Sequence, residues 1–392
     1  MMYEKEMTTL NPSVAADGEQ SLTRDGLIIT ENGSVVNGED VNLVNDETYD
    51  FEAEQREMWK SMEPNYLKTV SMPELYDTVY ASRPPVIDGL MYPGTYILAG
   101  APKLGKSFLM AQLAYHVSSG LPLWGFNVHK GSVLYLALED DYGRLQKRLY
   151  QMFGVEASEN LYLGTEAHIL GMGLTDQLDG FVKEHPDTKL IIVDTLQKIR
   201  GDVSDKYSYS TDYQDIVRLK AFTDRTGVCL MVVHHTRKQQ SDDKFDMISG
   251  TNGLLGAADG GFLLSKEKRT SNKALLEIAG RDQQDQKLHL VRDQERLLWI
   301  LEKAETELWT EPSDPLLEAV AELVNVDSPT WQGTATALVD ALGVDMKPNT
   351  LTMRLNVTAG RLFNEHGIQY QNKHGHGARQ IILRYVPEDN PA

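Results

Sequence analysis

Residues 97–115, ILAGAPKLGKSFLMAQLAY, place a glycine-rich turn between an apolar run and a helical pattern. Residues 95–100 are short and apolar enough for one buried strand. After the turn, the apolar residues Leu109, Met110, Leu113, Ala114 and Val117 share one face of a helix. The fixed positions of the motif G-x-x-x-x-G-K-[ST] are all filled, by Gly100, Gly105, Lys106 and Ser107. Strand, loop and helix therefore follow one another as in a phosphate-binding P-loop.

Such a loop binds phosphate because backbone N–H groups and a helix N-terminus converge on the same oxygens. Lys106 would add a positive charge, and the Ser107 hydroxyl would be a ligand of Mg²⁺. We therefore predict ATP and Mg²⁺ as the cofactors. The nucleotide-contacting residues are expected to be Gly100, Ala101, Pro102, Lys103, Leu104, Gly105, Lys106, Ser107 and Phe108.

Two further apolar runs end in carboxylates. Residues 133–138 precede Glu139, Asp140 and Asp141, and residues 190–193 precede Asp194. Carboxylates at the C-terminal ends of strands face the crevice in which α/β sheets bind ligands. One of the first three could polarise an attacking water, although acidic residues after a strand also form ordinary solvated turns. Asp194 is expected to act as a Walker B aspartate, which holds Mg²⁺ together with Ser107.

A fourth apolar run, GVCLMVVHHTRK at residues 227–238, ends in His234 and His235. Histidines there could hydrogen-bond the γ-phosphate or the attacking water. The alternatives are a metal-binding pair, for which the sequence offers no further cluster of ligands, and ordinary histidines at the edge of the core.

The composition indicates two folded units and an acidic N-terminal tail. The chain has 392 residues and a formal charge of −19, and residues 1–60 contain 14 acidic but only 4 basic side chains. That segment lacks sustained periodicity, so we expect it to be disordered. Cys229 is the single cysteine, and neither a signal sequence nor an apolar run of membrane-spanning length is visible. A soluble protein of the reducing cytoplasm, without membrane contact, is predicted.

The C-terminal region predicts a separate module at residues 312–386. A helix begins near residue 315 with Ser313 or Asp314 as its N-cap, two more helical patterns follow, and residues 368–386 read as a hairpin. Three helices and a two-stranded wing are typical of a winged-helix domain. Residues 329–385 contain 6 basic and 3 acidic side chains. This local excess of positive charge favours nucleic-acid binding, whereas a protein-binding module is the alternative. The candidate DNA-contacting residues are Arg354, Arg361, Lys373, His374, His376 and Arg379.

With GAPKLGKS, LALEDD, IIVDT and VVHHTRK in this order, the chain resembles RecA-like ATPases, and among them the RepA-type hexameric replicative helicases. The resemblance covers residues 65–305 and implies an α/β core with a mostly parallel sheet, assigned here to residues 61–305. It implies that Glu139 is the catalytic base and His235 the sensor. It is unlike the AAA+ pattern, in which the catalytic glutamate directly follows the Walker B aspartate, because Thr195 follows Asp194.

RecA-like ATPases complete their active sites with a basic residue from a neighbouring subunit. Near Gly261, where the RepA finger would align, this chain has no arginine, and Arg281 and Lys266 are the candidate replacements. The polar stretches 200–215 and 236–253 fall where such rings present DNA-binding loops. Their candidate contacts are Tyr207, Tyr209, Tyr213, Arg237, Lys238 and Lys244.

The resemblance implies an ATP hydrolase working as a homo-hexameric DNA helicase in the replication of a phage, plasmid or integrated element. Its partners would be single-stranded DNA and, through the C-terminal module, duplex DNA. Two alternatives stay open. One is a recombination or annealing ATPase that coats single-stranded DNA, and the other is an ATP-gated DNA-binding regulator.

Overall fold

The computed structural model describes residues 27–29, 35–37, 58–59, 62–80, 83–200, 209–236, 253–305 except 267, 269 and 282, 312–374 and 379–387. Within the N-terminal 60 residues, β1 (Leu27–Ile29) and β2 (Val35–Asn37) form an antiparallel pair. The rest of the segment expected to be a disordered tail lies almost entirely outside the described residues. None of the described helices is long and apolar enough to cross a lipid bilayer.

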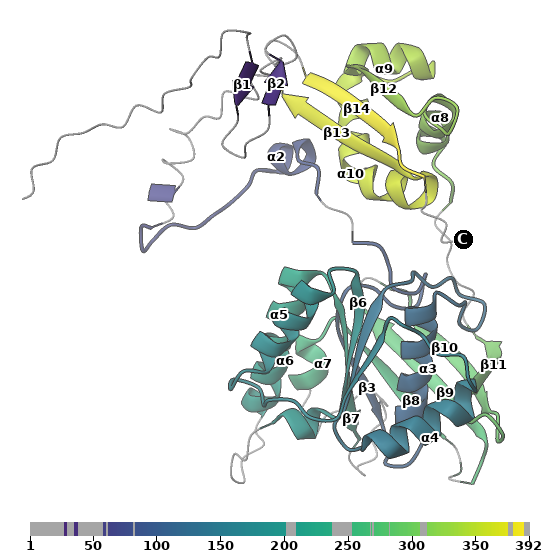
Figure 1. The fold of residues 1–392 in the computed structure, drawn as a ribbon. Helices are drawn as coiled ribbons and strands as arrows, with labels where there is room; N and C mark the ends of the chain where they lie inside the picture. The colour runs from purple at the N-terminus through teal and green to yellow at the C-terminus, as the bar shows by residue number, and fades with distance from the viewer. Residues whose placement is uncertain are drawn as a thin grey trace, which may run out of the picture. The chain divides into compact units, whose positions relative to one another are not determined.

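Among the described residues, a nine-stranded sheet in the order β11-β10-β9-β8-β3-β7-β6-β4-β5 forms the centre of the region predicted to be an α/β core (Figure 1). Six adjacent strands, from β8 to β5, run parallel. Their bounds are β3 (Gly94–Gly100), β4 (Ser132–Ala137), β5 (Leu161–Gly164), β6 (Thr188–Asp194), β7 (Cys229–His235) and β8 (Gly260–Ser265). The predicted α/β core with a mostly parallel sheet is confirmed.

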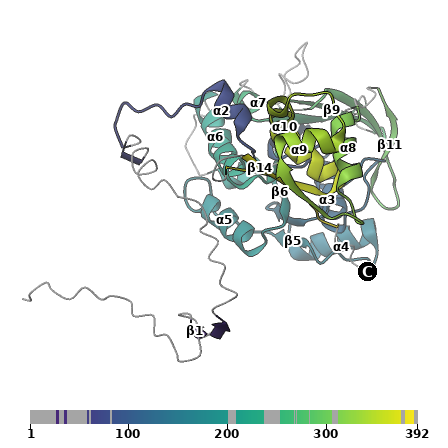
Figure 2. The ribbon, with the colours of Figure 1, turned by 90° about the horizontal axis from the view of Figure 1, so that it is seen from above.

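Helices cover both faces of this sheet, as Figures 1 and 2 show. The helices are α3 (Lys106–Ser119), α4 (Tyr142–Phe153), α5 (Leu174–Glu184), the 3₁₀ turn η1 (Leu196–Ile199), α6 (Tyr209–Thr226) and α7 (Gly253–Ala257). Successive residues of β3 enter opposite cores. Tyr96 and Leu98 pack with α3 and α4, whereas Ile97 and Ala99 pack with α5, α6 and η1. Burial on both faces explains why these strands are continuous apolar runs in the sequence.

The parallel register brings the ends of the four motif-bearing strands to one edge. Gly100 pairs with His235 across β3 and β7, and Ala137 pairs with Asp194 across β4 and β6. Residues that directly follow these strands therefore share the same edge of the sheet. This arrangement gathers the predicted site residues although about 135 positions separate the first from the last.

Three antiparallel strands extend the sheet beyond β8, namely β9 (Lys273–Gly280), β10 (Gln286–Arg292) and β11 (Trp299–Ala304). The Gln112 amide N–H donates to the Trp299 carbonyl at 2.9 Å, and the Gln112 side-chain oxygen accepts from the Trp299 N–H at 2.8 Å. The Trp299 indole N–H also donates to the Gly105 carbonyl at 3.3 Å. The start of β11 is thereby attached to the P-loop and its helix.

The C-terminal module has its own core, formed by three helices and a three-stranded antiparallel sheet. The elements are α8 (Pro315–Leu323), β12 (Thr330–Thr334), α9 (Ala335–Leu342), α10 (Pro348–His366), β13 (Ile368–His374) and β14 (Arg379–Tyr385). Asp314 is the N-cap of α8, since its side chain accepts from the Leu316 N–H at 2.9 Å. The three helices and the hairpin lie where the sequence predicted them. The additional strand β12, whose residues alternate between exposed and half-buried, was not predicted.

We predict opposite effects for alanine at two glycines. A Cβ at Gly100 would lie 2.6 Å from the Leu264 carbonyl oxygen of the paired strand β8, and backbone cannot move aside cheaply. A Cβ at Gly180, in α5, would meet nothing within 4 Å. Gly100→Ala should cost about 1–3 kcal/mol, as overpacked sites do. Gly180→Ala should stabilise by about 0.5–1 kcal/mol, because a helix interior favours alanine.

Urea denaturation of both variants, followed by far-UV circular dichroism, measures these changes. Equal midpoints for Gly100→Ala and the unmodified protein would contradict the close approach of β3 to β8.

Candidate functional site

The P-loop lysine is buried at the end of β3. Lys106 is 5% exposed, and its Nζ donates to the Gly100 carbonyl at 2.7 Å and to the Ala101 carbonyl at 3.1 Å. Gly105, before it, has φ +101°, a conformation that strains any residue with a Cβ. Burial lowers the pKa of Lys106 to about 8, although Asp194 and Glu139 oppose this shift. The ammonium group is therefore held inside the loop that would receive phosphate.

The end of β6 carries a buried carboxylate. Asp194 is 5% exposed and accepts at Oδ2 from the Tyr135 hydroxyl at 3.0 Å. Burial raises its pKa, while hydrogen bonds from Ser107 and Tyr135 lower it. Burial and the nearby Asp194 raise the pKa of Tyr135 itself, which keeps its proton available for donation. The contact between Ser107 and Asp194 brings together the two predicted Mg²⁺ ligands.

Glu139 follows β4 and lies beside the end of β6. The Thr195 hydroxyl donates to Glu139 Oε1 at 3.2 Å. Thr195, the residue after Asp194, thus orients the Glu139 carboxylate, which is expected to be the catalytic base. Because β4 and β6 are adjacent, a glutamate on one strand and an aspartate on the other reach the same cleft.

The two histidines at the end of β7 have different surroundings. His235 Nδ1 lies 3.0 Å from Lys106 Nζ and accepts from that ammonium group, which places the ring proton on Nε2. Burial and then Lys106 lower the pKa of His235. For His234, burial and Arg200 lower the pKa to about 4. Both rings are therefore neutral at pH 7, and His235 contacts the lysine of the loop.

These residues line one cleft of about 440 Å³. Its lining residues are Lys103, Gly105, Lys106, Ser107, Phe108, Glu139, Asp140, Arg144, Arg148, Asp194, Thr195, His235 and Arg292. The sequence reasoning missed the roles of Tyr135, Thr195, Arg148 and Arg292. Only Thr195, adjacent to Asp194, carried a local signal. Arg148 and Arg292 reach the cleft, and Tyr135 reaches Asp194, only through the fold.

The two finger candidates lie at opposite ends of the sheet within this chain. Arg281 follows Gly280, which pairs with Gly260 at the start of β8, and its guanidinium lies 3.8 Å from Asp259. Lys266 follows the other end of β8, and its Nζ is 5.3 Å from the centre of the Trp299 ring. A finger would act on a neighbouring subunit, so the structure of one chain tests neither residue. Both assignments remain predictions.

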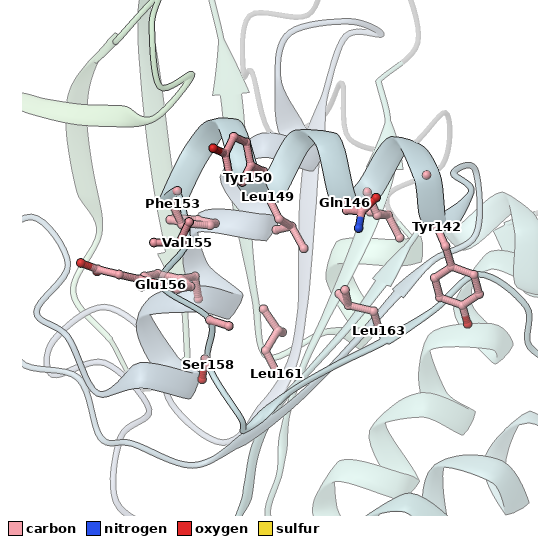
Figure 3. Close-up of a pocket in the computed structure, with 15 residues that line it drawn as sticks. Tyr142, Gln146, Leu149, Tyr150, Phe153, Val155, Glu156, Ser158, Leu161 and Leu163 are labelled. Carbon is pink, nitrogen blue, oxygen red and sulfur yellow. The ribbon is translucent and has the colours of Figure 1, made fainter.

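A second cavity lies away from this cleft, between α4 and β5 (Figure 3). It measures about 610 Å³ and is mainly apolar, with Leu149, Phe153, Leu161 and Leu163 among its walls. It shares no lining residue with the cleft. The nucleotide-site motifs are therefore confined to the smaller, more polar of these two hollows.

Residues 63–241 match a family model described as "AAA domain". No curated protein matches the chain. Among solved structures, a DnaB-like replicative helicase, described with its interactions with primase, is similar at 16% identity and TM-score 0.48, covering 64% of this chain and 71% of that one. A separately solved ATPase domain is similar at 16% identity and TM-score 0.46, covering 64% of this chain and 97% of that one.

The KaiC-like protein PH0186 from Pyrococcus horikoshii OT3 is similar at 14% identity and TM-score 0.40, covering 57% of this chain and 99% of that one. Because all three TM-scores are below 0.5, these structures do not define what this chain binds or acts on.

The matched residues 63–241 make up less than half of the chain, and they contain the P-loop, Glu139, Asp194 and His235. The mostly parallel sheet with helices on both faces agrees with the RecA-like core that the sequence predicted, and Glu139 follows the strand beside the one that ends in Asp194.

Replacing Tyr135 with phenylalanine is expected to destabilise the protein. The change removes the donor to the buried Asp194 Oδ2, and leaving a buried acceptor without its partner costs about 1–3 kcal/mol. Urea denaturation at pH 7 measures the loss. Tyr150→Phe, at a 65% exposed position of α4, is the matched control and should change stability little. Equal destabilisation by both variants would contradict the role given to the Tyr135–Asp194 contact.

Nucleotide affinity should decrease as the pH rises above about 8. In the free protein Lys106 is charged below this pKa and neutral above it, and phosphate binds the charged form. Affinity should therefore be constant below pH 8 and weaken by up to about tenfold per pH unit above it. Calorimetric titration with ATP between pH 6.5 and 9.5 measures this dependence. The Lys106→Ala variant should bind weakly at every pH, and an alkaline loss that persists in that variant would assign the titration to another group.

Proposed function

We propose that this protein is an ATP-dependent DNA motor, a RepA-like replicative helicase of a phage, plasmid or integrated element. The observation that carries the proposal is the convergence of Lys106, Glu139, Asp194 and His235 in one cleft. Each comes from the end of a different parallel strand or from the turn that follows it. Motor ATPases of the RecA type require this set of groups for hydrolysis and for reporting it.

The cleft fits ATP and Mg²⁺. A Cβ at Gly105 would lie 3.0 Å from Arg292 and 3.1 Å from Trp299, so only glycine leaves the loop this shape. Lys106 would move from the Gly100 and Ala101 carbonyls to phosphate oxygens, and Ser107 and Asp194 would hold Mg²⁺. The bound metal would neutralise charge that develops on the phosphates. Among the described residues, no group of three His, Cys, Asp or Glu side chains offers a separate metal site.

Glu139 would accept the proton of the attacking water. Its position is set by the Thr195 hydroxyl, which leaves the second carboxylate oxygen for the water. His235 contacts Lys106 and is the last residue of β7, the strand that leads to residues 237–250. Loss of the γ-phosphate would therefore change the contacts of Lys106 and His235 at the end of β7. The segment itself, with the candidate DNA contacts Arg237, Lys238 and Lys244, lies outside the described residues, as does Tyr207. The backbone of Tyr209 and the whole of Tyr213 belong to α6.

Hydrolysis is proposed to occur between subunits of a homo-hexameric ring, with Arg281 as the finger and Lys266 as the second candidate. Arg281 supports this role because its side chain is 57% exposed at the surface of the domain. Its contact with Asp259 at 3.8 Å is long for an ion pair, so a neighbouring nucleotide could attract it. Single-stranded DNA would pass through the ring.

We propose the domain limits 1–60, 61–305 and 312–386, the last being a winged-helix module. Arg354 already donates to both Asp314 oxygens, at 2.9 and 3.0 Å, and Arg361 donates to Glu365 and to the Pro312 carbonyl. Lys373, on β13, is exposed. The side chains of His374, His376 and Arg379 lie outside the described residues. Duplex binding through α10 would therefore require its two arginines to leave their present partners.

An ATP-gated DNA-binding regulator is the second candidate. The separate core of the C-terminal module favours it, because such a module can bind duplex DNA or protein without motor activity. The exposed side of α10 also includes Met353, Val357 and Phe363, which suit a protein contact better than a phosphate backbone. A recombination or annealing ATPase would share the same cleft.

The proposal predicts that single-stranded DNA stimulates ATP hydrolysis by a ring-sized oligomer. Turnover with and without DNA, and the mass in solution, are the measurements. Glu139→Gln should lower turnover by about 10²–10⁴-fold while ATP still binds, because it removes the base but keeps the size of the side chain. Unwinding of a forked duplex then separates a helicase from a DNA-coating ATPase. Hydrolysis by a monomer or dimer that ignores DNA would refute the motor and favour the regulator.

A further inference from the structure

Arg292 lies beside the P-loop although it is remote in the sequence. It is the last residue of β10, and β10 runs in the same direction as β8 because β9, between them, is antiparallel to both. Its end therefore reaches the edge of the sheet that carries the loop. A Cβ built on Gly105 would lie 3.0 Å from Arg292 Nη1. The guanidinium group is thus in contact distance of the loop backbone.

Two aromatic rings hold this guanidinium group. Its central carbon lies 4.2 Å from the centre of the Phe108 ring and 5.7 Å from that of Trp299. Phe108 directly follows Ser107 on the first turn of α3, and Trp299 donates to the Gly105 carbonyl. Stacking on rings fixes the plane of an arginine while leaving its N–H groups available. The residue is therefore oriented before any ligand arrives.

The guanidinium group has a hydrogen-bonding deficit. Arg292 Nε is buried and has no partner among the described residues, and no ion pair in that part of the chain joins Arg292 to a carboxylate. The neighbouring Arg148, by contrast, donates to Asp140 at 2.6 Å. Burial and the nearby positive charge of Arg148 lower the pKa of Arg292. Arg292 as a whole is half-buried, and an anion bound in the cleft would supply the partner that its buried Nε lacks.

The charged residues that line the cleft also favour an anionic ligand. Its lining includes five basic side chains, Lys103, Lys106, Arg144, Arg148 and Arg292, and three acidic ones, Glu139, Asp140 and Asp194. The chain as a whole carries −19. A local excess of positive charge in an acidic protein fits an anionic ligand, and planar guanidinium groups recognise phosphate in a bidentate manner.

We propose that Arg292 binds the phosphate chain of the nucleotide from within the same subunit, as a second cation beside Lys106. This inference rests on the proposed binding of ATP to the cleft. Phe108, on which Arg292 stacks, directly follows Lys106 and Ser107, so the guanidinium group lies beside the part of the loop that would hold the phosphates. The residue is a binding residue of its own subunit, distinct in role from a finger that reaches a neighbour.

The test is calorimetric titration of the full-length Arg292→Met variant with ATP, ADP and adenosine. Methionine keeps an unbranched stem against Phe108 and Trp299 but removes the charge. Affinity for ATP and for ADP should weaken at least tenfold, and added salt should weaken it less than in the unmodified protein. Arg292→Lys should recover part of the loss. Arg296→Met, at an exposed position between β10 and β11, is the control and should bind like the unmodified protein.

ADP affinity of Arg292→Met within twofold of the unmodified protein would overturn the proposal. So would an equal loss for adenosine and ADP, which would assign Arg292 to the nucleoside or to the shape of the cleft. Thermal unfolding without nucleotide confirms that the variant is folded. Lys106→Ala distinguishes failure of this proposal from failure of the nucleotide site, because unchanged ATP binding in that variant would refute the nucleotide site itself, whatever Arg292 does.

Discussion

The domain built on the nine-stranded sheet is organised around a buried ammonium group. Lys106 is almost fully enclosed, and an isolated cation in such a place would be strongly destabilising. Two carbonyls of the loop, a neutral histidine ring and two nearby carboxylates offset that cost. These partners come from β3, β4, β6 and β7. The positions of four strand ends are therefore tied to one side chain, and the same set of contacts is the one that nucleotide chemistry requires.

Hydrogen bonds that involve Trp299 of β11 also hold the P-loop in place. Trp299 donates to the Gly105 carbonyl, and Gln112 exchanges two hydrogen bonds with the Trp299 backbone. These contacts join the antiparallel extension of the sheet to the first turns of α3. The extension therefore does more than cover a sheet edge, because it also brings Arg292 over Phe108. The part of the fold beyond the family match at residue 241 thus contributes directly to the site.

In the C-terminal module, some features could be predicted from the local sequence and others could not. Asp314 before Pro315 predicted the start of α8, and the structure confirms that cap. Strand β12 escaped prediction because five residues of mixed character, TWQGT, acquire strand geometry only by pairing with β14. Arg354 and Arg361 looked like candidates for DNA contacts in the sequence. Glu365 is a local partner, four residues after Arg361 on the same helix, whereas Asp314 and Pro312 became visible only when α10 was packed against the start of the module.

The sequence by itself determined the class of this protein. The P-loop, the buried strands and the carboxylates after them are local patterns, because phosphate binding needs a glycine-rich turn and burial on both faces needs continuous apolar runs. Only the tertiary structure decided which side chains serve those motifs. Tyr135 meets Asp194 across 59 positions of the chain, and Gln112 meets Trp299 across 187. No local spacing encodes such pairs, since strand order and register bring them together. Arg292 belongs to the same group, because two reversals of chain direction return it to a loop that ended almost 190 residues earlier.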